Sequence, residues 1–206
     1  MVDPAEVGRL AAAHLALSAA GVALSAAIAI PLGVYVTRPG RKRLADAVLA
    51  AAGMAQTIPS LAVIALAMIA LGLGWAPALL ALVLYGFLPV LHNTVAGFEG
   101  VPADLLEAAA GLGMSPGQIL AAVEWPLALP VMLGGLRTCV VLTIGTAALA
   151  AEIGAPCLGN LIFQGVSTSS LDLTLAGAIP TALLAIGADL GLGALERRLV
   201  PAEVRA

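Results

Sequence analysis

The sequence predicts an all-α membrane protein with about five transmembrane helices, and two observations lead to this prediction. Of its 206 residues, 61% are hydrophobic and only 10% are charged, whereas a soluble domain carries about 25% charged residues. So few charges cannot cover a surface that faces water, and lipid is therefore the expected solvent. The hydrophobic residues also form long runs, and a helix needs about 20 such residues to cross the hydrocarbon core. No internal repeat or low-complexity linker divides the runs, which indicates a single transmembrane domain, residues 1–206.

The first expected span covers residues 10–36 and contains few polar residues besides His14 and two serines. This run is too long for the hydrophobic part of a secretory signal, and it ends at a basic cluster. We therefore expect a retained helix. The other expected spans cover residues 44–73, 78–95, 127–150 and 173–195.

The run 44–73 is too long for one straight span and too short for two. Its middle holds Gln56, Thr57, Pro59 and Ser60. Because proline removes a backbone donor and breaks a helix, we predict one tilted span that is bent or broken at Pro59. Broken helices expose backbone carbonyl groups next to cavities, so these polar residues are candidates for a pathway or gate. A packed kink with locally satisfied polar groups explains them equally well.

Polar residues inside two other spans are further pathway candidates. Asp189 lies in the fifth expected span and Arg137 in the fourth, and charged groups in lipid are costly enough to indicate a function. Asp189 is also close enough to the end of its span to reach the interface or to form a hydrogen bond across helices. Asn93, near the cytoplasmic end of the third expected span, is expected either to line a pathway or to lie at the membrane–water interface.

Five spans place the two termini on opposite sides of the membrane. The basic loop 38–43 and the basic C-terminal tail, with Arg197, Arg198 and Arg205, fall on the same side in this count. Loops rich in lysine and arginine stay in the cytoplasm. We therefore expect the N-terminus outside and the C-terminus in the cytoplasm.

The loop 98–126 is also expected on the cytoplasmic side, yet it contains four acidic residues and no basic ones. Lipid orientation does not explain this acidity, which indicates a protein partner. The loop is expected to form two short helices. Pro102 and Asp104 suit a first helical turn, and Gly113 suits the turn that follows.

The second short helix is expected to begin at Ser115. Serine is a good N-cap residue, Pro116 fits the first helical position, and Gln118 completes a capping box. Trp125 and Pro126 are expected to end this helix at the membrane surface.

The same loop resembles the EAA motif of ABC importer permeases. The similarity rests on Glu107, Ala108 and Ala109, on Gly113 at the right spacing, and on residues 123–126. Valine and tryptophan stand at 123 and 125, where isoleucine and leucine are usual.

Other segments are similar to the osmoprotectant subfamily of these permeases, which serves importers of glycine betaine, choline or carnitine. These segments are residues 56–61, 88–94, 126–130, 135–138 and 179–198. The sequence departs from the subfamily at 154–159, in the expected outer loop 152–172. Pro156 and Cys157 replace glycines there and are expected to stiffen the loop.

The resemblance implies the fold of a type I ABC importer transmembrane domain with a cytoplasmic coupling helix pair. In this family the pair docks into a cleft of the ATPase subunit. The implied coupling residues are Glu107, Ala108, Ala109, Gly113, Ser115 and Pro126. Glu107 would be a polar contact, Ala108 and Ala109 a close-packing surface, and Gly113 the turn.

The implied partners are an ABC ATPase subunit, an extracytoplasmic substrate-binding protein and a second permease subunit, identical or related. The expected location is the bacterial cytoplasmic (inner) membrane, with lipid around the chain. ATP and magnesium belong to the ATPase, so no cofactor is expected on this chain. The seven aromatic residues are scattered and predict no cage for a quaternary ammonium group, so the binding protein is expected to select the solute.

Three other functions compete with this interpretation. A methionine-type amino-acid permease is the nearest rival, and a channel or ion-driven secondary transporter leaves the capped acidic loop without a purpose. An enzyme is disfavoured, because neither a P-loop nor a Gly-x-Ser-x-Gly motif is present. A metal site is also disfavoured, since His14, His92, Cys139 and Cys157 are widely separated and the two cysteines are expected to be free. No basic stripe indicates nucleic-acid binding.

Overall fold

The computed structural model describes residues 3–199, and this part of the chain contains helices and no strand. The helices are α1 (Pro4–Val36), α2 (Lys42–Gln56), α3 (Ser60–Leu71), α4 (Trp75–Glu99), α5 (Ala103–Gly111), α6 (Pro116–Ile119), α7 (Trp125–Ala147), α8 (Gly159–Ser167) and α9 (Leu171–Leu199). A π-helical turn, η1 (Leu120–Glu124), joins α6 to α7, and a 3-10 segment, η2 (Ala148–Ile153), extends α7. The predicted all-α class is confirmed.

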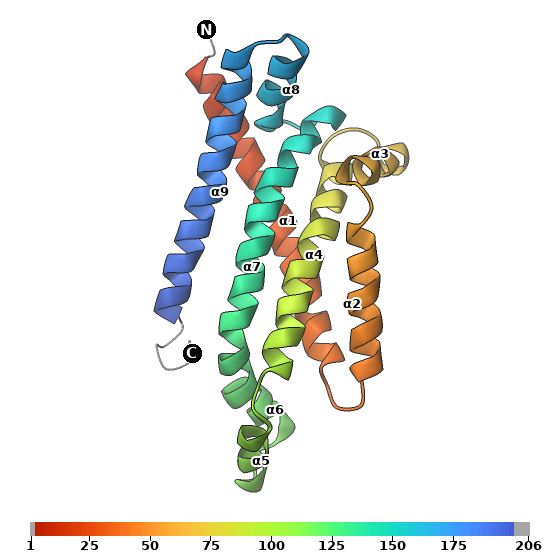
Figure 1. The fold of residues 1–206 in the computed structure, drawn as a ribbon, viewed down its shortest axis with the longest axis vertical. Coiled ribbons are helices and arrows are strands. Elements are labelled where there is room, and N and C mark those ends of the chain that lie inside the picture. The colour runs from red at the N-terminus through yellow and green to blue at the C-terminus, as the bar shows by residue number, and fades with distance from the viewer. Residues whose placement is uncertain (1–2, 200–206) are drawn as a thin grey trace.

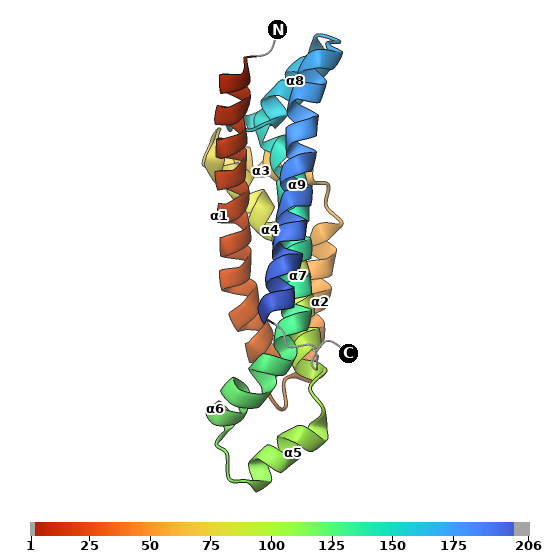
Figure 2. The ribbon, with the colours of Figure 1, turned by 90° about the vertical axis from the view of Figure 1, so that its left-hand side faces the viewer.

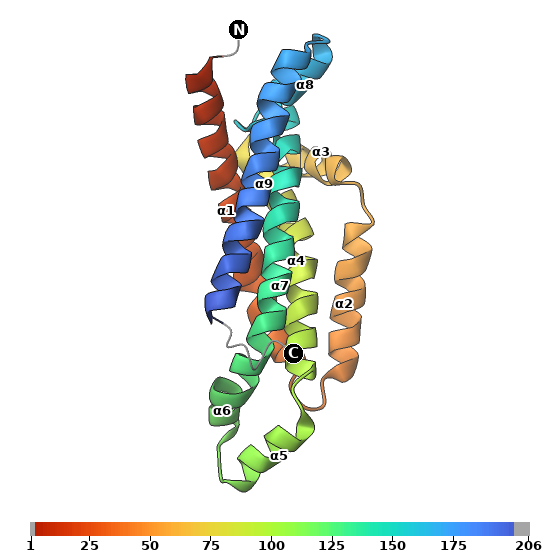
Figure 3. The same ribbon diagram turned by 60° about the vertical axis from the view of Figure 1, so that its left-hand side comes forward.

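Within residues 3–199, four helices are long and apolar enough to cross a membrane by themselves: α1, α4, α7 with its extensions, and α9. The pair α2 and α3 provides a fifth span if it is counted as one broken helix, with a bend of 91° between its halves. The sequence predicted this break at Pro59. Figures 1 and 3 show α3 lying across the end of the bundle, while α2 runs along it.

The ends of the first helix differ from the hydropathy boundaries. The predicted span began at residue 10, whereas α1 begins at Pro4. Asp3 caps this start, because its side chain accepts a hydrogen bond of 2.9 Å from the Ala5 N–H, and Glu6 lies in the first turn. Hydropathy marks where lipid begins, but capping and the helix dipole decide where the helix begins.

Helix α4 is central and packs against α1, α2, α3 and α7. Glycines make the close approach possible, as is common where helices pack in membranes. A Cβ atom at Gly33 of α1 would lie 2.6 Å from Thr94 Cγ2, and one at Gly135 of α7 would lie 2.6 Å from the Pro89 carbonyl oxygen. Helix α9 stands at the side of the bundle against α7, α8 and α1 (Figure 3).

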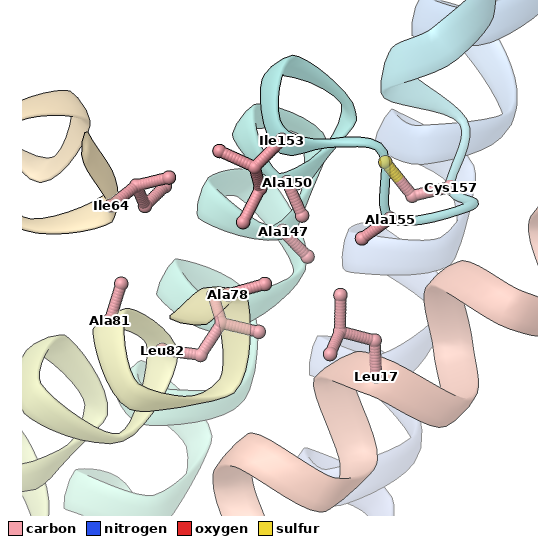
Figure 4. Close-up of a cluster of buried hydrophobic side chains, with 10 residues drawn as sticks. All are labelled: Leu17, Ile64, Ala78, Ala81, Leu82, Ala147, Ala150, Ile153, Ala155 and Cys157. Carbon is pink, nitrogen blue, oxygen red and sulfur yellow. The ribbon is translucent and has the colours of Figure 1, made fainter. Parts of the chain in front are cut away.

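A cluster of buried apolar side chains holds several helices together (Figure 4). Its ten members come from α1, α3, α4, α7, η2 and the segment after it: Leu17, Ile64, Ala78, Ala81, Leu82, Ala147, Ala150, Ile153, Ala155 and Cys157. Five of the ten are alanines, which let the helices and the segment approach closely, and the leucines and isoleucines fill the space between them.

The predicted outer loop 152–172 is therefore more ordered than expected. It contains α8, and residues Ala155, Cys157 and Leu158 are fully buried. The packing of this segment, together with the left-handed Gly154 at φ +76°, holds it against the bundle. Cys139 and Cys157 are both free, as expected, and both are buried.

The two ends of the bundle are distinct. Helices α5 and α6 project beyond one end (Figure 2). The connection between α1 and α2, which carries the basic residues, and the end of α9 lie at that same end. The start of α1 and helix α8 lie at the opposite end.

Candidate functional site: a protruding helix pair and polar positions between the spans

The protruding helix pair, α5 and α6, is built by local capping signals. Asp104 lies in the first turn of α5, where a negative charge is favourable. The chain then turns at Gly113, whose φ of +83° suits glycine best. At α6, the Ser115 N–H donates to the Gln118 side chain over 2.8 Å, and the Gln118 N–H donates back to the Ser115 hydroxyl over 3.4 Å. The predicted turn and capping box are confirmed.

The expected end of this second helix at Trp125 and Pro126 is wrong. Helix α6 continues through η1 into α7, and the Trp125 N–H donates to the carbonyl of Leu120, five residues back. This wider π-helical turn comes directly before Pro126, which lies in the first turn of α7 and needs no N–H donor there. The chain is therefore helical without interruption over Pro116–Ile153.

The exposed surface of the pair differs in part from the predicted one. Glu107 and Ala108 are exposed, but Ala109 is only 5% exposed. Its carbonyl accepts a hydrogen bond from the Met114 N–H, so Ala109 packs inside the pair and is not part of its outer surface.

Sequence reasoning missed two leucines of this surface. Leu105 is 44% exposed and Leu112 is 84% exposed. With Ala108 they lie at i, i+3 and i+7, a spacing that places them on one side of a helix. We call these three residues the apolar face of α5. An apolar spacing of this kind inside an otherwise acidic loop was the signal available in the sequence.

A second cluster joins the root of the pair to α1. Arg38, just after α1, donates from Nη1 to Glu124 Oε2 over 2.7 Å and from Nε to the Val34 carbonyl over 3.0 Å. Its guanidinium lies 5.5 Å from the ring centroid of Phe98, which stacks edge-on with Trp125 at 5.9 Å. Glu124 is buried. We call Arg38, Phe98, Glu124 and Trp125 the root cluster, since it holds both ends of the loop against α1.

The polar residues near the α2–α3 break are satisfied locally. Pro89 has no N–H, which leaves the Tyr85 carbonyl of α4 without its helical donor. The Gln56 side-chain amide donates to this carbonyl over 2.8 Å, and the Tyr85 hydroxyl donates to the Ile58 carbonyl. These contacts tie the broken span to α4.

The remaining candidates near the break also have partners or lie at helix ends. The Thr57 hydroxyl donates to the Met54 carbonyl over 2.8 Å. Pro59 and Ser60 stand at the start of α3. The Asn93 amide donates to the Pro89 carbonyl over 2.9 Å. Asn93 thus lies in the close contact between α4 and α7 rather than beside Gln56.

The two charges inside the spans form an ion pair. Arg137 of α7 donates from Nε and Nη2 to the two carboxylate oxygens of Asp189 in α9, the second bond being 2.7 Å long. The side chains keep exposed fractions of 37% and 34%. They lie in a groove of about 440 Å³ whose other lining residues are Gly134, Thr138, Val141 and Leu142.

A second groove, of about 630 Å³, runs between α1, α7 and α9 and is lined almost entirely by apolar residues, with Ser18 the polar side chain among them. Near it His14 is fully buried and lies 2.8 Å, through Nε2, from the Ile144 carbonyl. Among residues 3–199 no group of histidine, cysteine and acidic side chains is placed to hold a metal ion.

A broken-span helical bundle with a capped pair at one end is the fold of type I ABC importer transmembrane subunits. It superimposes on a subunit of the MetNI methionine ABC transporter in an inward-facing conformation with a TM-score of 0.85, covering 98% of this chain and 100% of that one. The sequences are only 22% identical, so the likeness concerns the fold alone.

The sequence comparisons identify the family. Residues 29–201 match the model of the binding-protein-dependent transport system inner membrane component, and the chain belongs to this family. It is 47% identical to the carnitine transport permease protein OpuCD of Listeria monocytogenes, over 91% of this chain and 84% of that protein. It is 41% identical to the choline transport system permease protein OpuBB of Bacillus subtilis, over 92% and 86% of the two chains.

Proposed function

We propose that this chain is the permease subunit of an ABC importer for quaternary-ammonium osmoprotectants such as glycine betaine, carnitine or choline. The main support for this proposal is the strong similarity, along nine-tenths of the chain, to permeases named for carnitine and choline transport. The osmoprotectant import permease protein OsmY of Salmonella typhimurium, 43% identical over 91% of this chain, supports the same substrate class.

In this proposal the protruding helix pair couples the chain to a separate ATPase subunit that binds ATP and magnesium. Glu107 and the apolar face of α5 form the contact, Gly113 and Ser115 fix the turn, and Ala109 holds the pair together. Because the helix is continuous over Pro116–Ile153, Pro126 included, a displacement of α6 moves α7 as well. A rigid element of this kind can bias a bundle with two arrangements.

The other partners follow from the same proposal. A substrate-binding protein delivers the solute at the end that carries α8, and a second permease subunit completes the pathway. The basic turn after α1 lies at the end of the protruding pair, which supports a cytoplasmic position for that end, an outside N-terminus and a cytoplasmic C-terminus in the bacterial inner membrane.

The proposed pathway or gate involves polar positions of the spans: Gln56, Thr57, Pro59, Ser60, Asn93 and Asp189. The hydrogen bond of Gln56 to the Tyr85 carbonyl of α4 favours a role in holding the broken span, whereas the Asn93 side chain bonds within α4 itself. Asp189, in a groove, is the best-placed group to meet a solute.

The test is co-purification from membranes with the candidate ATPase, followed by uptake of labelled solute. Leu112→Ser should abolish capture of the ATPase, because it removes the most exposed part of the apolar face of α5. Leu73→Ser is the matched control, since Leu73 is 74% exposed at the opposite end of the bundle.

ATPase capture by the wild type and by Leu73→Ser, with ATP-dependent uptake of glycine betaine, carnitine or choline, is the expected result. Capture with uptake of methionine or another amino acid instead would move the substrate to the amino-acid class. A wild-type chain that captures no ATPase would reject the importer function and reopen the channel and secondary-transporter alternatives.

A further inference from the structure

The Arg137–Asp189 ion pair joins two membrane-spanning helices, α7 and α9. Arg137 comes twelve residues after the first residue of α7 and Asp189 eighteen residues after the first residue of α9, which are distances of about 18 and 27 Å along the helix axes. Asp189 lies ten residues before Leu199, the last residue of α9, which is a distance of about 15 Å. Neither charge therefore belongs to the last turn of its helix, although the pair is nearer to the end of α9 that carries Arg197 and Arg198.

One side of α9 is expected to face lipid. That side carries large exposed hydrophobic residues at helical spacing: Leu175, Ile179, Leu183, Ile186 and Leu190. The pair, in contrast, keeps about one third of each side chain exposed (37% and 34%). Because charged groups inside a membrane face a polar cavity or another protein group rather than lipid, the groove is expected to face the aqueous pathway.

The groove has space for a small solute over the charges. Its volume of about 440 Å³ falls within the range of about 300–1,000 Å³ usual for ligand sites. Nothing lies within 4 Å of a Cβ atom built on Gly134, so the wall is open there. A Cβ atom at Gly193 of α9 would lie 3.3 Å from Arg137 Nη1. The missing side chain at this position therefore leaves room for the guanidinium against α9.

The pair is neutral as a whole, and this limits which ligand can use it. A lone cation such as choline would have to take Asp189 away from Arg137 and leave that guanidinium without its carboxylate partner, which is unfavourable between membrane-spanning helices. A zwitterion replaces both partners, because its carboxylate pairs with Arg137 while its ammonium group approaches Asp189. The exchange leaves every charge paired and requires no aromatic cage.

We infer that the Arg137–Asp189 groove is a transient binding site for zwitterionic solutes on their way through the membrane, and that it favours betaine-type solutes over choline. This inference rests on the proposed importer function. It names a substrate class and a site within the permease itself, in addition to any selection by a binding protein.

The first test asks whether water reaches the groove and whether the solute binds there. Thr138→Cys places a thiol in the groove, and Leu183→Cys places one on the lipid-facing side of α9, where the parent residue is 63% exposed. The chain in vesicles, assembled with its partners, is treated with a charged, water-soluble thiosulfonate. The parent chain gives the background, because its own two cysteines are buried.

Modification of Thr138→Cys but not of Leu183→Cys is expected, with protection by glycine betaine and less protection by an equal concentration of choline. A Thr138→Cys thiol as unreactive as Leu183→Cys would overturn the inference, since the groove would then face lipid or be covered by a second copy. Equal protection, or none, by the two solutes would overturn it as well.

The second test uses the double variant Arg137→Met/Asp189→Leu, which removes both charges and keeps similar volumes. Replacing both partners of an ion pair by apolar residues is often tolerated. We expect glycine betaine uptake to fall by about tenfold or more, the effect of losing a charge-assisted hydrogen bond. Membrane abundance of the complex should stay at the wild-type level.

The outcomes separate this inference from the proposed function. Wild-type uptake with an equally active double variant would reject the site and leave the importer function standing. No uptake by the wild type would reject the importer function itself. If the double variant fails to accumulate, the pattern of thiol modification decides.

Discussion

At the scale of single residues, prolines and glycines decide how the spans are held together. Pro89 leaves the Tyr85 carbonyl without a backbone donor, and the Gln56 side chain from another span donates to this carbonyl over 2.8 Å. Gly135 lets α7 approach α4 so closely that a Cβ atom would meet the Pro89 carbonyl oxygen at 2.6 Å. The first effect follows from the missing N–H of Pro89 and the second from the missing side chain of Gly135, and together they hold α2 and α7 against α4.

The neighbouring glycines of α7 provide a matched prediction. Gly135→Ala should destabilise the protein by about 1–3 kcal/mol, because overpacking forces the helix backbones apart. Gly134→Ala should be neutral or stabilising by up to about 1 kcal/mol, since its Cβ would be in open space and alanine favours a helix. Thermal unfolding in detergent measures both. Equal effects at the two positions would contradict the close packing of α7 on α4.

The thiol of Cys157 should be slow to react. Burial raises the pKa of this thiol above its ordinary value, so less thiolate, the reactive form, is present near neutral pH. Maleimide labelling of Cys157 in membranes should be slow at pH 7. Its rate should increase by about tenfold per pH unit, and this increase should continue at pH values above the ordinary thiol pKa of about 8.5. A Cys157→Ser chain carrying Ser167→Cys, an exposed position on α8, is the control. Labelling of Cys157 as fast as that of the control would show that the segment 154–159 opens from the bundle.

At the scale of elements, the root cluster connects α1 to the protruding helix pair. Arg38 reaches Glu124 from α1, and the rings of Phe98 and Trp125 close the cluster from α4 and α7. The loop between α4 and α7 is thus held at both ends. A force applied to α5 and α6 is expected to move three helices together, rather than α7 alone.

Reversing the charge of Arg38 tests this connection. Arg38→Glu should loosen the root and cost part of the about 3–5 kcal/mol that breaking a buried pair costs, since the Arg38 side chain remains 27% exposed. Limited proteolysis of the turn between α5 and α6 should then become faster. The double variant Arg38→Glu/Glu124→Arg should restore the wild-type rate. Arg41→Glu makes the same change of charge in the same turn but does not involve Glu124, and it should change the proteolysis rate little. An effect as large as that of Arg38→Glu would mean that membrane orientation, not the root cluster, causes the result.

At the scale of the whole molecule, two surfaces support the proposal that this chain is one part of a larger transporter. The apolar face of α5 is exposed at one end, and a charged groove opens on the side of α7 and α9. Each needs a polar or protein environment that a single copy in lipid does not provide. The proposed ATPase and second permease subunit would supply it.

Glu107→Lys should therefore uncouple the complex while leaving the chain folded. Glu107 is exposed on α5, so the change should not alter membrane abundance or thermal stability. Uptake should fall by at least about tenfold if a charged contact to the ATPase is reversed, with Glu107→Gln showing a smaller loss. Normal uptake by Glu107→Lys at normal abundance would remove Glu107 from the coupling surface.

The sequence by itself determined the features that depend on neighbouring residues. Long hydrophobic runs defined the spans, Pro59 the break, and Gly113, Ser115 and Gln118 the turn and cap of the protruding pair. These features act over a few residues, through backbone hydrogen bonds and contact with lipid, so a single sequence is enough to predict them.

Only the tertiary structure decided which distant residues meet. Arg38 and Glu124 are 86 positions apart and Arg137 and Asp189 are 52 apart, and no local pattern joins them. The burial of Ala109, the packing of the segment 154–159 and the continuous helix through Pro126 were also missed. The first two depend on how helices pack against one another, which hydropathy and capping residues do not encode. The third depends on a π-helical turn before Pro126, which the proline itself does not announce.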